Sequence, residues 1–142
     1  MATYRVKASS ANPTKTVVTA RSFQIIVDEP KSIGGTDEGA TPVEYVLGAL
    51  AGCLSVVGHL VAKEMNMPLE GIDFELEGDL NPARFSGKAT DERAGFQEIR
   101  VKISPKTTAD EATVAKWLET VEDRCPVSDN LANPTPVKIT LT

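Results

Sequence analysis

The sequence predicts an α+β protein built around one long apolar helix, with the element order β-β-β-α-β-β-α-β. Apolar and polar residues alternate in residues 72–80 and 97–105, which is typical of strands with one face in water. An apolar run at residues 43–62 follows helix-start signals, and a second helical pattern follows residue 107. A chain of 142 residues has the length of one domain, so we expect a single domain over residues 1–142.

Three short strands are expected before the long helix, over residues 3–10, 14–20 and 22–29. They are rich in β-branched residues, and the pair Asn12-Pro13 marks the turn between the first two. A loop at residues 31–40 contains three glycines and leads into the helix.

The start of the long helix carries three signals in four residues. Thr41 is a favourable N-cap, and Pro42 suits the first helical position. Glu44 stands three residues after Thr41, which makes a capping box. We expect this helix to run to about Met65.

The apolar run of this helix is about as long as a bilayer span. It contains Glu44, Ser55 and His59, however, and both of its flanks have the pattern of a water-exposed sheet. We therefore expect it in a protein core or a subunit interface rather than in a membrane. Gly48 and Gly52 lie on one face, which indicates close approach of another backbone.

The second half of the chain continues as a hairpin, a helix and a last strand. Residues 81–96 are rich in turn formers and connect the two alternating strands. Thr108 and Glu111 have the spacing of a second capping box at the start of the next helix. Residues 125–136 are expected to form a short turn or helix fragment, and residues 137–141 a closing strand.

Charge and composition exclude several functions. The net charge of −5 and the scattered arginines argue against binding to nucleic acid, whose phosphates attract a basic surface. The N-terminus has no apolar signal segment, so we expect a cytoplasmic protein, in which structural disulfides are rare. One histidine and two cysteines without zinc-site spacing predict no metal. We expect His59 to be a packed or interface side chain and Trp117 to lie in the core.

The two cysteines each allow two interpretations. Cys53 is in the middle of the apolar helix, where an unpaired cysteine can simply pack as a small apolar residue. Cys125 precedes Pro126 and follows Arg124, so it is either an activated thiol at a helix start or a half-buried loop thiol. If the thiols met, one could resolve a sulfenic acid formed on the other, but their spacing does not show that they meet.

The stretches GGTDEGATPVEYVLGALAGC and RCPVSDNL, followed by a terminal strand, resemble the OsmC/Ohr family of thiol peroxidases. The resemblance implies an intertwined homodimer in which two long helices are buried between sheets. It also implies that Cys53 is the peroxidatic cysteine, that Cys125 is the resolving cysteine, and that no cofactor is bound. Organic hydroperoxides would be the substrates, bound in an apolar pocket at the subunit interface, and a dithiol of the lipoyl type would be the reductant.

Two positions depart from the organic-hydroperoxide branch of that family. There a helix carboxylate ten residues before the reactive cysteine organises the thiol, and this chain has Val43 at that position. The neighbouring Glu44 is better explained as a helix cap. The arginine of that branch has no clear match, so Arg21, Lys31 or an arginine of the partner subunit could take its place. In both respects the chain resembles the less characterised OsmC-like branch.

We therefore expect a cysteine-based peroxidase that acts in oxidative or osmotic stress protection. The alternative is a non-enzymatic OsmC-like dimer whose apolar interface pocket binds a small molecule. In either case helical periodicity predicts which side chains flank Cys53. These residues, none of which has a side-chain hydrogen-bond donor, are Val46, Ala49, Leu50, Val56 and Val57.

Overall fold

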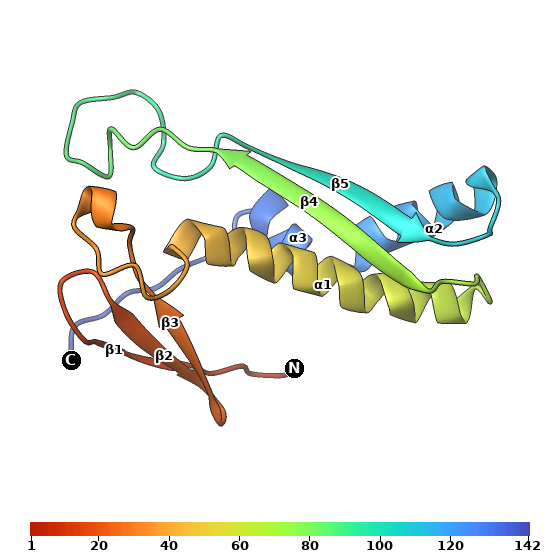
Figure 1. Ribbon diagram of the computed structural model, residues 1–142, viewed down its shortest axis with the longest axis horizontal. Coiled ribbons are helices and arrows are strands. Elements are labelled where there is room, and N and C mark those ends of the chain that lie inside the picture. The colour runs from red at the N-terminus through yellow and green to blue at the C-terminus, as the bar shows by residue number, and fades with distance from the viewer. The chain divides into compact units, whose positions relative to one another are not determined.

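The computed structural model describes all 142 residues and shows the expected mixture of helices and antiparallel strands. The chain forms two compact units, residues 1–46 and residues 47–142, which are described in turn (Figure 1). The α+β class is confirmed. The single domain and the homodimer stay predictions.

The first unit is built on a three-stranded antiparallel sheet in the order β1-β2-β3. Its strands are β1 (Lys7–Ser10), β2 (Thr16–Ala20) and β3 (Phe23–Val27), each shorter than expected. The side chain of Asn12 accepts hydrogen bonds from the backbone N–H groups that follow it and closes the β1–β2 turn. The glycine-rich loop after β3 contains a short 3-10 helix, η1 (Lys31–Ile33).

Asp28 organises the loop between β3 and the long helix. Its side chain has 0% exposure and accepts hydrogen bonds from the hydroxyl of Thr36 and from the backbone N–H groups of Glu29 and Glu38. These donors, the Thr36 hydroxyl foremost, hold the pKa of Asp28 far below its usual value. Gly35 is also required here, because a Cβ at this position would lie 1.7 Å from the carbonyl oxygen of Glu29.

The long helix α1 (Pro42–Glu64) begins and ends close to the predicted positions. One side of it forms the core of the second unit, with Leu50, Leu54, Val57, Val61 and Ala62 buried. The opposite side is exposed and carries Gly48, Ala49, Gly52, Val56 and Leu60. The helix is long and apolar enough to cross a bilayer, but its buried side favours a core helix.

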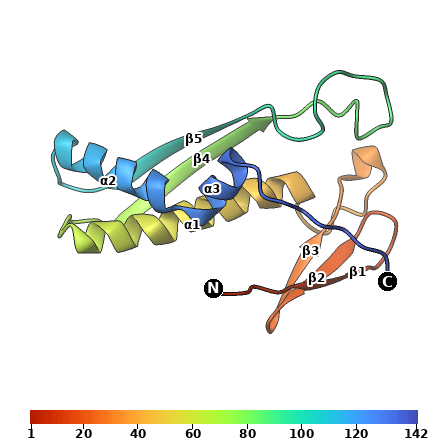
Figure 2. The ribbon, with the colours of Figure 1, turned by 180° about the vertical axis from the view of Figure 1, so that it is seen from behind.

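Strands β4 (Gly71–Asp79) and β5 (Glu98–Lys106) form an antiparallel hairpin in which Leu76 lies opposite Val101. Figures 1 and 2 show the hairpin running alongside α1. One face packs against the core, and its side chains are Ile72, Phe74, Leu76, Ile99, Val101 and Ile103. The alternation seen in the sequence is therefore confirmed as one apolar and one wet face.

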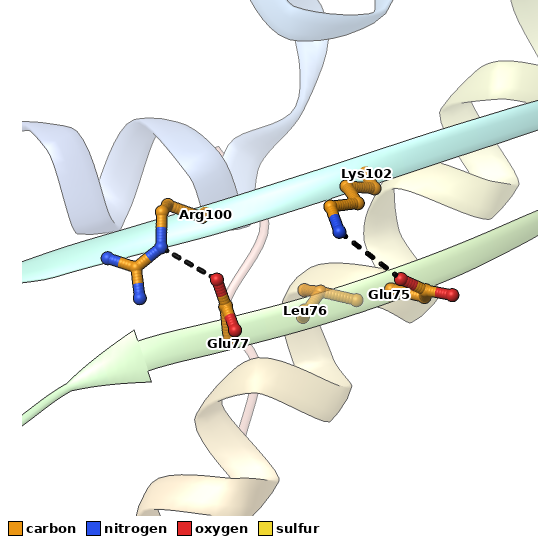
Figure 3. A pocket seen from close by; sticks show the side chains of 5 residues that line it. All are labelled: Glu75, Leu76, Glu77, Arg100 and Lys102. Carbon is orange, nitrogen blue, oxygen red and sulfur yellow. Dashed lines mark hydrogen bonds and ion pairs between the residues drawn. The ribbon is translucent and has the colours of Figure 1, made fainter.

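The wet face of this hairpin is a ladder of ion pairs. Arg100 pairs with Glu77 at 2.8 Å and with Asp79 at 2.6 Å, and Lys102 pairs with Glu75 at 3.7 Å. Figure 3 shows Glu75, Glu77, Arg100 and Lys102 with the two ion pairs that join them. Together with Leu76 they line a hollow whose volume is about 70 Å³. So small and charged a hollow fits a solvated surface better than a ligand site.

Two helices complete the second unit, α2 (Glu111–Arg124) and α3 (Pro126–Ala132). The capping box expected at the start of α2 is wrong: Asp110 is the N-cap and accepts a hydrogen bond of 2.8 Å from the N–H of Thr113. Thr107, just upstream of this helix, donates its hydroxyl to the carbonyl of Pro68. This contact ties the segment before α2 to the segment before β4.

Trp117 packs α2 against α1. Its side chain is 1% exposed, and its Nε1–H donates a 2.8 Å hydrogen bond to the carbonyl of Gly58. The core position predicted for this tryptophan is confirmed. Because Gly58 has no side chain, the indole can lie directly against the helix backbone.

The closing strand expected at residues 137–141 is absent, since residues 133–142 have no regular secondary structure. Its apolar side chains point into solvent, with Val137 80% and Ile139 90% exposed. A strand needs a hydrogen-bonded neighbour, and this segment finds none within its own chain. The alternation of residues predicted a strand here, but alternation does not show whether a neighbouring strand is present to pair with it.

Candidate functional site

Cys53 lies on α1 at the edge of the core of the second unit. It is half-buried and packs against the buried cluster that includes Cys125. Burial raises the pKa of the Cys53 thiol above its ordinary value, and the backbone N–H of Val127 offsets part of this effect. The neighbouring Cys125 thiol raises the Cys53 pKa further.

Cys125 is the single residue that connects α2 to α3. It is the C-cap of α2 and the N-cap of α3, where its Sγ accepts a 3.5 Å hydrogen bond from the N–H of Ser128. Pro126 occupies the first position of α3. The predicted N-cap role is confirmed. The half-buried loop thiol is wrong, because Cys125 is 1% exposed.

The structure thus brings the two cysteines together, as a dithiol of free cysteines. Such a pair can close to a disulfide once one sulfur is oxidised. The cation adjacent in sequence does not serve it, because Arg124 forms an ion pair with Glu64 at the end of α1. The dithiol therefore lacks a basic neighbour within its own unit that would favour the thiolate.

The start of α1 shows that Glu44 acts as a cap. Its carboxylate accepts hydrogen bonds from the N–H of Thr41 at 2.7 Å and from the hydroxyl of Thr41 at 2.9 Å. The Thr41 hydroxyl in turn accepts from the Glu44 N–H at 3.3 Å. The predicted capping box is confirmed, and these bonds lower the pKa of Glu44. Val43 beside it is 38% exposed.

Of the two candidate cations of the first unit, Arg21 lies in a turn and Lys31 in a short 3-10 helix. Arg21 follows β2 with φ of 58°, and its guanidinium lies 5.0 Å from the ring centre of Phe23. Lys31 opens η1. The structure pairs neither of them with a carboxylate of its own unit, so both are free to interact with another group.

An apolar groove lies beside the dithiol within the second unit. It has a volume of about 280 Å³, and its lining residues come from α1, β5, α2 and α3: Leu50, Leu54, Val101, Ile103, Leu118, Glu122 and Ser128. Of the side chains expected to flank Cys53, only Leu50 lines it. Val57 is in the core, and Val56 is 71% exposed.

The sequence pattern predicts the apolar residues of this groove as inward-facing side chains, but it does not predict the groove. Val101 and Ile103 alternate along β5, and Leu118 belongs to the apolar stripe of α2, so each was identifiable as apolar and inward-facing. A gap between such side chains depends on how the elements pack, which periodicity does not report.

His59 was expected to be a packed or interface side chain, and it is not packed within its own chain. The interface position stays a prediction. Its side chain is exposed, and its Nδ1 lies 2.9 Å from the carbonyl oxygen of Ser55. It lies one turn and a half along α1 from Cys53 and belongs to the exposed side of the helix. The structure contains no group of three His, Cys, Asp or Glu side chains placed to hold a metal ion.

The family model described as OsmC-like protein matches residues 35–140. No curated protein matches the sequence. Among solved structures, an OsmC-like protein from Mycoplasma pneumoniae is similar, with 22% identity, a TM-score of 0.80, and coverage of 92% of this chain and 88% of that one.

Two structures described as organic hydroperoxide resistance proteins are also similar. The one from Legionella pneumophila has 20% identity and a TM-score of 0.65, with coverage of 92% of this chain and 90% of that one. The one from Elizabethkingia anophelis has 17% identity and a TM-score of 0.65, with coverage of 91% and 87%. At these identities the likeness shows a shared fold.

Proposed function

The chain belongs to the OsmC-like family, and from this premise we propose that it is a thiol peroxidase for organic hydroperoxides. The observation that carries the proposal is the contact between Cys53 and Cys125, two free thiols that come from distant parts of the chain. The family match covers both cysteines. We place the protein in the cytoplasm, where a dithiol can be kept reduced.

In the proposed reaction, the Cys53 thiolate attacks one peroxide oxygen, the O–O bond breaks, and the alkoxide leaves as an alcohol after taking up a proton. Cys53 is then a sulfenic acid. The Cys125 thiol attacks its sulfur, water leaves, and a disulfide forms. A cellular dithiol, of the lipoyl type in the family reading, reduces the disulfide by exchange.

Cys53 is the better candidate for the attacking sulfur because it is the more exposed of the two. Cys125 is 1% exposed and engaged as a helix cap, which suits a resolving thiol. The raised pKa of Cys53 limits the thiolate fraction at neutral pH. A cation delivered by Arg21, Lys31 or a partner subunit would lower this pKa and speed the reaction.

The homodimer is proposed on the exposed side of α1. This side carries Val56, 71% exposed, and Leu60, 47% exposed, next to the open surface at Gly48 and Gly52. An exposed apolar stripe of this kind marks an interaction surface. Light scattering should give twice the chain mass of 15.2 kDa, with dissociation only on unfolding. A stable folded monomer at micromolar concentration would contradict it.

The peroxidase is tested by the mass of the intact protein after one equivalent of cumene hydroperoxide. Loss of two hydrogens indicates the disulfide. Cys53→Ser should abolish peroxide consumption, whereas Cys125→Ser should allow one rapid oxidation of Cys53 to the sulfenic or sulfinic acid. If Cys125→Ser abolished peroxide consumption and Cys53→Ser allowed one oxidation, Cys125 would be the attacking thiol and Cys53 the resolving thiol.

Two observations favour a second function. Val43 stands where the organic-hydroperoxide branch has a carboxylate, and the pKa of the Cys53 thiol is raised. In this alternative, the protein is a non-enzymatic dimer that binds a small molecule in an apolar pocket. An unchanged mass, or stepwise addition of oxygen without disulfide formation, would support it. The same experiment therefore separates the two functions.

A further inference from the structure

Helix α3 is the least anchored helix of the second unit. It has seven residues and none of them is buried, whereas α1 and α2 both contribute side chains to the core. A helix this short is marginal by itself, because its nucleation is costly and few hydrogen bonds offset that cost. The stability of α3 therefore depends on the contacts at its two ends.

The contacts at the start of α3 are made by the two cysteines. Cys125 is the N-cap, and its Sγ accepts the Ser128 N–H at an N···S distance of 3.5 Å. Val127 packs against the same cluster as Cys53, and its N–H is a donor to the Cys53 Sγ. Because Pro126 has no N–H, these two groups are the free donors that follow the cap in the first turn, and both are directed at sulfur.

The end of α3 holds the segment that follows it. The backbone N–H of Asn133 donates to the Asp129 carbonyl at 3.0 Å. The side-chain amide of Asn133 donates to the same carbonyl and to the Asp129 carboxylate, both at 3.1 Å. Residues 133–142 have no regular structure of their own. Helix α3 thus connects the dithiol at its start to this segment at its end.

We propose that α3 responds to the redox state of the dithiol: the sulfur cap holds it in the reduced protein, and disulfide formation weakens the cap and loosens α3 together with the start of residues 133–142. The inference rests on the proposed function in one respect, that Cys53 and Cys125 can form a disulfide. In that step an oxidant takes two electrons and two protons from the two thiols as the S–S bond forms.

The reason lies in which elements are free to move. The two sulfurs must come from contact to bonding distance when the disulfide closes. The core fixes α1 next to Cys53 through Leu54, which is 4% exposed, and it fixes α2 before Cys125 through Val121, which is 0% exposed. The Cys125 Sγ therefore turns toward Cys53 and away from the Ser128 N–H. Because α3 buries no side chain, it takes up the displacement.

The test compares the dithiol and disulfide forms of the full-length protein. Diamide is the oxidant, which accepts the two electrons and two protons to become a hydrazine, and intact mass verifies the loss of two hydrogens. NMR then measures amide exchange with water, which reports local opening. The reporters are the N–H groups of Asp129, bonded to the Cys125 carbonyl, and of Asn133, bonded to the Asp129 carbonyl.

Both reporters should exchange at least about two-fold faster in the disulfide form. Loss of an ordinary oxygen cap shifts a helix equilibrium by about 2- to 30-fold, and sulfur, a weaker acceptor, belongs at the low end. The N–H of Val114 at the start of α2 is the internal control, because it bonds to Asp110, whose oxygen caps that helix. Its exchange should not change.

Two variants separate the cap from other effects of oxidation. Cys53→Ser cannot form the disulfide, so the same diamide treatment should leave exchange in α3 unchanged. Cys125→Ala lacks the cap acceptor, so it should show the fast exchange under reducing conditions as well.

Three results would overturn the inference. Equal or slower exchange of Asp129 and Asn133 in the disulfide form shows that the cross-link holds α3 as well as the thiols do. Faster exchange of Val114, or of α3 in diamide-treated Cys53→Ser, shows an effect other than the disulfide. Slow exchange in reduced Cys125→Ala shows that sulfur is not what holds the helix.

Failure of this inference and failure of the proposed function give different results. A diamide-treated protein that keeps both thiol hydrogens overturns the inference and the disulfide of the proposed reaction together. A protein that forms the disulfide with α3 unchanged overturns the inference alone.

Discussion

Gly58 is a point of close contact between α1 and the elements packed on it. A Cβ at this position would lie 2.7 Å from Ile72 Cδ1 and 3.0 Å from Trp117 Cζ2. The indole cannot retreat freely, because its Nε1–H is bonded to the Gly58 carbonyl. Gly58→Ala therefore forces Ile72, or the indole and its hydrogen bond, to move.

Two opposing effects decide the magnitude. Alanine is favoured over glycine inside a helix by about 1 kcal/mol. Overpacking a core by one methyl group costs about 1–3 kcal/mol, and the Cβ distances here are shorter than ordinary contacts. We expect Gly58→Ala to lower the free energy of unfolding by about 1 kcal/mol, from the difference between these effects.

The assay is urea unfolding, followed by circular dichroism and by the fluorescence of the single tryptophan, at one protein concentration for all variants. Ile72→Val removes the atom nearest the new methyl group and on its own costs about 0.5–1.5 kcal/mol. The double variant should be more stable than the sum of the two losses predicts. A gain of about 1 kcal/mol for Gly58→Ala alone, equal to the helix preference, would refute the reasoning.

Three further predictions concern charge. The folded-state pKa of Asp28 lies below its unfolded value near 4. The stability that the ionised side chain contributes is therefore present at neutral pH and is lost as the pH falls below the unfolded-state value. In thermal unfolding scans, Asp28→Asn should be less stable than wild type at pH 7, with a smaller deficit at pH 3. Arg100→Met leaves three carboxylates unneutralised, so it should lower Tm at low salt and have little effect near 1 M salt, where the screening length is about 3 Å. The rate of Cys53 oxidation by cumene hydroperoxide should keep rising to at least about pH 8.5, because its pKa is raised; a plateau near pH 6 would show that a cation from elsewhere reaches the thiol.

Features set by neighbouring residues could be predicted from the sequence, and features set by distant contacts could not. Thr41, Pro42 and Glu44 determine the start of α1 among themselves, and that prediction is confirmed. At α2, the spacing of Thr108 and Glu111 predicted a capping box, but the N-cap is Asp110. The hydrogen bond from Thr107 to Pro68 just before this helix joins residues 39 positions apart, and local spacing does not report such a contact.

The same distinction between local and distant contacts applies to the candidate site. The N-cap role of Cys125 is local and was foreseen, whereas its burial and its contact with Cys53 come from the packing of α2 and α3 on α1. The closing strand at residues 137–141 had the right pattern but no partner strand within the chain. His59 shows that a position on an apolar helix need not be buried.

The double role of Cys125 affects how substitutions at this position are interpreted. Serine keeps an acceptor for the Ser128 N–H but puts a hydroxyl into a core position that is 1% exposed. Alanine suits the core but leaves the start of α3 without its cap, a loss of about 0.5–2 kcal/mol for ordinary caps. An effect seen only in the alanine variant reports on the missing cap of α3, and an effect seen only in the serine variant reports on the buried hydroxyl. An effect common to both variants reports on the missing sulfur.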